Sequence, residues 1–388
     1  MKYSFTKINI QAPFPTTACG HSCQTVLLNE FHDPLYVRVF SFKNDDLWII
    51  HYSLDLLAFD LEHRDLLEEK LKEHYKDDHI RVITSTTHTH YANSVRDPKY
   101  VEYLFDLLLK ETVKMEYRDV EDVTASYQRI HSTAVGKSRI SGYETNNEML
   151  CLIRFYQKEN NFFNIVTYNC HPTILKAETP YFSAEYPGYV LKKLEDTYPE
   201  SDFTFFQGAA GDISSRFVRD GQDYEALTKL GDALFSQIIS LMNEEAERKP
   251  LKFTYKEVPI EYDHEFTPID LSKIRSDLSE REMETIRLGQ IERQKLENKA
   301  SEIFSSLIRK ALIVSLDIAC VKFIFFPNEI FSKYMDYIDL NHEILLSYSN
   351  GYGPYVLPID FEYITYEMFT DTLTRKTKEK IIEILQTI

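Results

Sequence analysis

Glycine is scarce in this chain, with 11 among 388 residues. The scarcity argues against a glycine-rich loop that would hold the phosphates of a nucleotide. Long apolar runs are also missing, since none approaches the roughly 18 residues that cross a bilayer, so we expect no stable membrane insertion. Positive charge is in deficit, and the net charge is −17. That balance disfavours nucleic acid and anionic membrane surfaces as main partners.

Cysteines are few and odd in number, at positions Cys19, Cys23, Cys151, Cys170 and Cys320. The absence of a paired framework fits a reducing compartment, and the first residues lack the apolar segment and cleavage site of a signal peptide. We therefore expect a cytoplasmic protein whose last three cysteines are buried thiols in apolar, strand-like runs. Cys19 and Cys23 flank a histidine and could bind a metal, but no second cysteine pair completes a zinc site, so their role stays open.

Hydrophobic residues make up 43% of the chain, enough for a substantial core. Periodicity predicts helices over 61–75, 98–115, 189–198 and 223–242, and strands over 35–42, 47–53, 79–85, 150–156, 162–168, 203–206 and 311–326. Hairpins between some of the strands favour an α/β fold with a mixed central β-sheet flanked by helices, in one domain over residues 1–388. A highly charged segment at about 270–310 predicts a helical insertion, which we interpret as a solvated helix face rather than a partner-binding arm.

The most informative stretch is 82–90, where a β-branched apolar run ends in Thr and Ser residues and then in His88 and His90. On a strand, residues two apart point to the same face. Two imidazoles at the carboxyl end of a buried strand are a common beginning of a metal site. The alternative is a histidine pair in a solvated loop.

Four further segments place polar groups just after a buried strand: 169–173 with His171, 206–216 with Asp212 and Ser214, 325–329 with Glu329, and 349–355 with Tyr352. Ligands of open α/β sheets gather at strand ends, so these segments could hold His88, His171, Glu329 and a tyrosine around one ion. Each segment alone has a simpler explanation, such as a His-Pro turn, a carboxylate on a helix dipole, or a Gly/Pro turn. Their joint appearance favours a site.

The chain resembles the neutral (non-lysosomal) ceramidase family of zinc-dependent amidases. The matching segments are His32-Asp33-Pro34-Leu35-Tyr36, Thr87-His88-Thr89-His90, His171-Pro172-Thr173, Gly211-Asp212-Ile213-Ser214, Pro327-Asn328-Glu329 and Asn350-Gly351-Tyr352-Gly353-Pro354-Tyr355. They occur in the family's order over roughly residues 5–370. The resemblance implies a ceramidase-like catalytic domain with a mixed central sheet and one zinc ion.

The resemblance also implies roles for single residues. The zinc ligands would be His88, His171, Glu329 and Tyr352. His90 would act on the transition state or support a ligand, Ser214 matches the family's functional serine, and Arg139 resembles a substrate-side arginine. From its position we expect Asp212 to orient a ligand or the loop.

The chain departs from the family in places that bear on the substrate. Ser214 is followed by Ser215-Arg216 where the family has Pro-Asn, and His90 is followed by Tyr91-Ala92-Asn93 where many members have a Ser-Gly-Pro turn. We also expect neither the signal peptide nor the C-terminal immunoglobulin-like domain of secreted ceramidases. The predicted substrate is therefore a soluble N-acyl compound smaller than ceramide, which can be lipid-like, in a cleft between 91–97, 139–144 and 213–218.

The hypothesis is a zinc-dependent hydrolase that cleaves an amide bond by attack of zinc-bound water. His90 and Tyr352 are candidate donors to the oxyanion, and Ser214 would orient the water or relay a proton. An acyl-serine route is the minor variant. The alternatives are a zinc esterase or peptide-type amidase on a small polar substrate, and a non-catalytic ceramidase-like binding protein. The sequence predicts neither the acyl chain, the amine half nor the oligomeric state.

Overall fold

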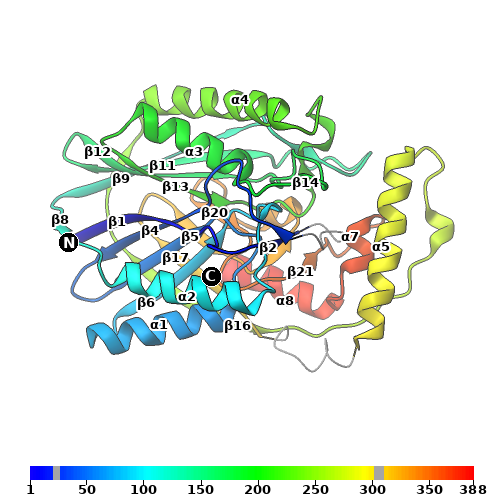
Figure 1. The fold of residues 1–388 in the computed structure, drawn as a ribbon, viewed down its shortest axis with the longest axis horizontal. Helices are drawn as coiled ribbons and strands as arrows, with labels where there is room; N and C mark the ends of the chain where they lie inside the picture. The colour runs from blue at the N-terminus through cyan, green and yellow to red at the C-terminus, as the bar shows by residue number, and fades with distance from the viewer. Residues whose placement is uncertain (21–26, 301–309) are drawn as a thin grey trace.

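The computed structural model describes residues 1–20, 27–300 and 310–388, and within them three larger sheets carry most of the strands. The first sheet has the order β6-β5-β4-β1-β8, in which β5 and β6 are parallel and the other pairs antiparallel. Its strands are β1 (Lys2–Asn9), β4 (Tyr36–Lys43), β5 (Trp48–Leu54), β6 (Ile80–Thr86) and β8 (Arg118–Asp119). Helices α1 (Leu61–Tyr75) and α2 (Pro98–Thr112) cover one face, because Leu67, Leu71, Leu104 and Leu108 recur at helical spacing and pack on it (Figure 1).

The second sheet has the order β13-β12-β11-β9-β15, with a parallel pair between β12 and β13. Its strands are β9 (Val123–His131), β11 (Met149–Gln157), β12 (Asn160–Tyr168), β13 (Asp202–Gln207) and β15 (Arg248–Pro250). Helices α3 (Glu185–Thr197) and α4 (Tyr224–Asn243) cover it on the opposite side of the molecule from α1 and α2 (Figure 1).

The third sheet packs against the other two in a shared core and has the order β16-β17-β18-β20. Its strands are β16 (Thr254–Glu261), β17 (Lys310–Asp317), β18 (Lys322–Phe325) and β20 (Glu343–Leu346), and β18 and β20 are parallel. Helix α8 (Arg375–Thr387) and the short helix η4 (Ser332–Tyr337) pack on its outer face.

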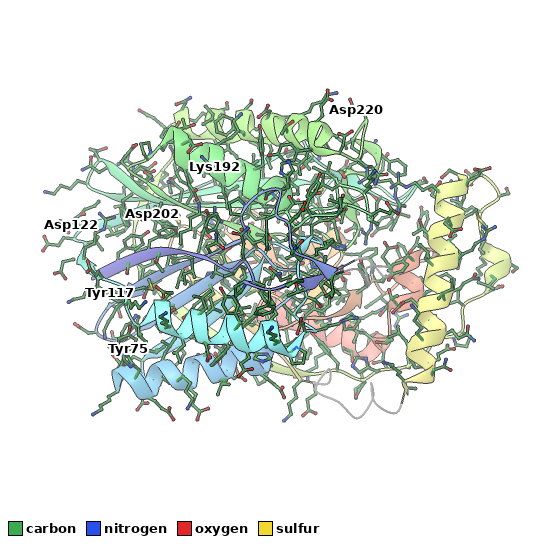
Figure 2. All side chains as sticks on the ribbon, in the orientation of Figure 1. Tyr75, Tyr117, Asp122, Lys192, Asp202 and Asp220 are labelled. Carbon is green, nitrogen blue, oxygen red and sulfur yellow. The ribbon has the colours of Figure 1, made fainter. Side chains whose placement is uncertain are left out.

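Aromatic side chains from all three sheets share one buried cluster, which includes Phe42, Phe163 and Phe325. The sheets are also tied by polar contacts, since the Tyr3 hydroxyl donates to Asp202 at 2.9 Å. Figure 2 labels Asp202 near the end of the molecule that holds the N-terminus. Because the inner faces meet in one core, the strand ends of all three sheets are held in fixed positions relative to one another.

Short strand pairs at these strand ends carry the candidate site. They are β10 (Lys137–Ser138) with β14 (Ile213–Ser214), β19 (Asn328–Ile330) with β21 (Gly353–Val356), and β2 (Thr16–Cys19) with β3 (Leu27–Leu28) and β7 (Ala92–Asn93). The short helix η1 (Ser215–Phe217) follows β14 directly.

The charged segment forms the short helix η2 (Leu271–Lys273) and helix α5 (Glu280–Asn298), while 301–309 lie outside the described residues. Ser279 and Glu282 start α5 with a reciprocal capping box. The helix stands at one end of the molecule beside α7 (Tyr366–Thr370), and Ile286, Gly289 and Arg293 are buried there (Figure 1). The predicted solvated face is therefore only one side of α5.

The predicted mixed α/β class is confirmed, with the strands divided among several mixed sheets. Several boundaries differ from the sequence prediction. Helix α2 ends at Thr112, α3 begins at Glu185, and the run 311–326 is divided into β17 and β18. Cys151, Cys170 and Cys320 are buried as predicted, but only Cys151 lies in a strand; Cys23 is outside the described residues. Among the described helices, none is both long and apolar enough to cross a membrane.

Candidate metal centre

The histidine pair lies beyond the strand that was predicted to carry it. Strand β6 ends at Thr86, and His88 has a left-handed backbone with a φ of 64°. Two backbone hydrogen bonds hold this turn, from Thr87 to Leu54 and from His88 to Leu56, each at 2.9 Å. The two rings meet because of this turn rather than strand alternation: the Nε2 atoms of His88 and His90 are 3.4 Å apart.

Backbone carbonyls fix the tautomers of two histidines. Nδ1 of His88 lies 2.8 Å from the carbonyl oxygen of Leu57, and Nδ1 of His171 lies 2.6 Å from that of Ala210. A carbonyl only accepts, so both Nδ1 atoms carry the proton and both Nε2 atoms present a lone pair. Metal-binding histidines in proteins are oriented in this way.

The Nε2 lone pairs converge on Glu329, which lies in β19. Its Oε2 atom is 3.0 Å from Nε2 of His171 and 3.6 Å from Nε2 of His88. Nitrogen atoms of His88, His90 and His171 also lie within 4.8 Å of one another. Acceptor atoms so close together need a cation or shared protons between them. The donor set of imidazoles and one carboxylate suits zinc, so the residues fit the metal that the sequence predicted.

Charge states at the cluster agree with that fit. Burial, with the positive charge of Arg139, lowers the pKa of His171 to about 4, which leaves a neutral imidazole at pH 7. Burial alone would raise the pKa of Glu329, but the imidazoles of His88 and His171 outweigh it and hold that pKa well below its usual value. The cluster therefore presents a neutral imidazole and an ionised carboxylate, the forms that bind a metal.

Two tyrosines border the cluster. The Tyr352 hydroxyl donates to Oε1 of Glu329 at 2.5 Å, so the predicted ligand meets the carboxylate. Tyr348, which the sequence analysis missed, stacks on His88 with ring centroids 3.8 Å apart, and its hydroxyl lies 3.5 Å from Nε2 of His171. The sequence did hold a signal for it, because Tyr348 follows β20 at a strand end, as the other site residues follow theirs.

Asp212 positions the chain segments that carry the site. Its carboxylate accepts from the backbone NH and the hydroxyl of Ser332, at 2.6 and 2.8 Å. Burial raises the pKa of Asp212 to about 6. Next to it, a Cβ on Gly211 would meet the carbonyl oxygen of Glu329 at 2.7 Å, so only glycine allows this approach. Asp212 thus fastens its loop to the segment after Glu329 rather than contacting a histidine.

Ser214 is buried beside His171. The two residues form an isolated β-bridge, and the backbone NH of His171 donates to Ile213 at 3.0 Å. The Ser214 hydroxyl accepts from the backbone NH of Arg216 at 3.3 Å. The structure therefore places Ser214 next to His171, a predicted metal ligand.

Arg139 is held from several sides. Its Nη2 atom donates to the Gly211 carbonyl at 2.7 Å and to the Tyr355 hydroxyl at 3.0 Å. Its Nε atom lies 2.8 Å from Glu367. Tyr355 and Glu367 were not predicted as site residues, because nothing in their local sequence links them to Arg139.

Comparisons with known proteins give a likeness of fold. No family model matches the chain, and no curated protein matches its sequence. Two solved structures match over 99% of this chain: a neutral ceramidase from Pseudomonas aeruginosa, with a TM-score of 0.73, 13% identity and 73% of that chain covered, and a ceramidase complexed with C2, with a TM-score of 0.76, 12% identity and 74% covered. The chain has the fold of these ceramidases.

A cavity of about 270 Å³ has the candidate site residue Arg139 in its wall, where we had predicted a cleft, and none of the predicted metal ligands lines it. Arg139, Ser141 and Arg216 line it, in agreement with two of the three predicted walls. The third predicted wall, 91–97, does not line this cavity. Tyr91 is buried in the core below α3 and α4, and the remaining walls are α5 and the segment 362–367.

Proposed function

We propose that this protein is a zinc-dependent hydrolase that cleaves the amide bond of a soluble N-acyl compound. The observation that carries the proposal is the convergence of His88, His171 and Glu329 on one point, with two lone-pair nitrogens facing an ionised carboxylate. The ceramidase fold over 99% of the chain supports the same reaction class. Zinc, when bound there, would supply a Lewis acid and a water molecule whose pKa is lowered to about 7.

The chain's own residues supply the remaining chemistry. Tyr352 and His90 border the cluster and carry polar hydrogens that can stabilise an oxyanion at the carbonyl. Ser214 lies beside His171, where its hydroxyl can orient water or pass a proton to the departing amine. We assign Tyr352 as the fourth zinc ligand, as the sequence predicted. Tyr348 is a neighbour of the same cluster.

The second candidate is a zinc esterase or peptide-type amidase, because the same cluster would activate attack on an ester. The small cavity beside the site favours a small polar substrate over a long chain. A non-catalytic binding protein is the third candidate. The cytoplasmic location stays a prediction.

Metal analysis and a matched substrate pair test the proposal. The purified protein should contain about one zinc per chain, and removal of the metal with a chelator should abolish hydrolysis until zinc is restored. An N-acyl amine and the ester of the same acyl group should both be measured, and the amide should be cleaved. Turnover that persists in the metal-free protein would contradict the proposal. Stoichiometric metal without turnover of either substrate would favour a binding protein.

A further inference from the structure

The cavity beside the cluster is built from segments far apart in the sequence, and its walls are rich in cations. We call it the cationic cavity. Its charged lining residues are four cations, Arg139, Arg216, Lys273 and Arg275, and three carboxylates, Glu282, Glu362 and Glu367. It lies toward the end of the molecule where α5 stands beside α7 (Figure 1).

Two of its arginines are already neutralised. Arg139 pairs with Glu367 at 2.8 Å, and Arg275 pairs with Asp277 at 2.6 Å. The acids are engaged or exposed: Glu367 pairs with Arg139, Glu282 accepts from Ser141 and caps α5, and Glu362 is exposed to water. Lys273 is exposed, so water solvates its charge.

Arg216 is the exception. Its guanidinium donates to the Arg139 carbonyl at 3.3 Å and to the Thr285 hydroxyl at 3.4 Å, and both acceptors are neutral. No carboxylate of the described residues forms an ion pair with it. Burial, together with the positive charge of Arg139, lowers the pKa of Arg216 to about 10, so it remains charged at pH 7. The charges of Glu367 and Glu282 act on Arg216 from a distance, but neither carboxylate forms an ion pair with it, and Glu367 is paired with Arg139. A half-buried cation without a carboxylate in direct contact favours the arrival of an anion.

Arg216 also belongs to the reaction site by position. It is two residues after Ser214, and its backbone NH donates to the Ser214 hydroxyl. Arg216 also donates to the carbonyl of Arg139, and the charge of Arg139 acts on His171 and Glu329, so Arg139 links the position of Arg216 to the cluster. A carboxylate matches one guanidinium, because the planar fork donates two parallel hydrogen bonds to it.

We propose that Arg216 binds a carboxylate of the substrate, so that the enzyme acts on carboxylate-bearing amides such as N-acyl amino acids. The proposal rests on the proposed function and adds the substrate class to it. The carboxylate can sit on the amine half or on the acyl half of the amide, and the experiment separates these two cases.

The test compares matched amides with the metal-loaded enzyme. One arm is an N-acylglycine, with the carboxylate on the amine half; its neutral partner is the corresponding N-acylglycinamide. The other arm is an N-alkylsuccinamate, with the carboxylate on the acyl half; its neutral partner is the N-alkylsuccinamide. We expect kcat/KM to be at least tenfold higher for the acid than for its neutral partner in one arm. Equal or lower values for the acids in both arms would overturn the proposal without any variant.

Variants then assign the preference to Arg216. Arg216→Gln should reduce the preference for the acid over its neutral partner about tenfold or more, mainly through KM for the acid, while the metal content stays near wild type. Arg216→Lys should retain part of the preference, because it keeps the charge but loses the fork. Arg287→Gln is the matched control, since Arg287 is an exposed arginine of α5 that pairs with Glu284. An equal loss for acid and neutral substrates in Arg216→Gln would contradict the assignment.

A binding measurement separates this proposal from the proposed function. Calorimetry with N-acetylglycine and N-acetylglycinamide needs no turnover. In one outcome, the acid binds more tightly than the neutral amide and loses this advantage in Arg216→Gln, and yet no amide is hydrolysed. That result would support carboxylate binding by Arg216 and contradict the proposed hydrolase activity. If neutral amides are hydrolysed and the acid binds no more tightly than its neutral partner, the proposed hydrolase activity is supported and carboxylate binding by Arg216 is contradicted.

Discussion

The metal centre and the cationic cavity are neighbours, but they are built in different ways. At the metal centre the polar atoms of His88 and His171 are held by backbone carbonyls, and both side chains are 1% exposed. At the cationic cavity the contacts join side chains and loops of separate elements, such as Arg216 with Thr285 of α5 and Arg275 with the Ser141 carbonyl. Backbone hydrogen bonds to a shared core resist displacement, whereas contacts between partly exposed side chains yield more easily.

Under the proposed function, this difference assigns the reaction to the metal centre and the choice of substrate to the cationic cavity. Changes at the metal centre should remove metal and activity together. Changes at the cavity should alter preference among substrates and leave the metal in place. The following predictions test that division.

The largest effect is expected from loss of a metal ligand. His88→Ala or His171→Ala should reduce zinc from about one per chain to a small fraction and reduce amide turnover to background, because each imidazole presents a fixed lone pair to the ion. Metal analysis and rate measurements on the purified variants check this. His79→Ala is the control, since His79 is exposed and contacts Asp77. Zinc retained by both variants would contradict the metal assignment.

Ser214→Ala should have the next largest effect. If Ser214 aids water or proton transfer, the rate should fall by about 10²–10⁴ while zinc is retained. Mass spectrometry of the wild type during turnover provides the check on mechanism. An acyl group found on Ser214 would favour the covalent route instead.

The contrast between the metal centre and the cationic cavity also explains which parts of the site the sequence could predict. His171 and Glu329 follow or end buried strands, so a change from apolar to polar residues marked them. The left-handed turn at His88 was not predictable, because a non-glycine residue there depends on the hydrogen bonds to Leu54 and Leu56. The cavity walls formed by α5 and the segment 362–367 were not predicted, because these partners of Arg139 and Arg216 lie far along the chain. Strand periodicity identifies the ends of elements, not which distant helices meet there.

Asp212→Asn should have a moderate, pH-dependent effect on stability. Burial raises the pKa of Asp212 from 3.8 to about 6, so the folded protein holds this proton more tightly than the unfolded chain. The free energy of unfolding of the wild type, relative to that of the variant, is therefore highest below pH 4. It falls by on the order of 3 kcal/mol as the pH rises to 6. An asparagine can still accept from the Ser332 NH. Denaturant unfolding of both proteins between pH 4 and 7 gives the difference. A difference that does not change with pH would show that this proton is not bound more tightly in the fold.

The smallest effect is expected from the packing that supports the cavity wall. A Cβ on Gly289 of α5 would meet Cδ2 of Phe369 on α7 at 2.7 Å and the Cα of Tyr366 at 3.1 Å. Alanine raises helix propensity by about 1 kcal/mol, but overpacking costs about 1–3 kcal/mol, so Gly289→Ala should lose about 1 kcal/mol of stability.

Because α7 also carries Glu367, the partner of Arg139, that displacement should raise KM for the acid substrate with the zinc content unchanged. Gly231→Ala is the matched control: its Cβ would meet Tyr189 of α3 at 2.5 Å, at a helix contact on another side of the molecule. We expect the control to lose stability without a change in KM. If both variants raise KM equally, the cavity wall has no separate part in binding the substrate.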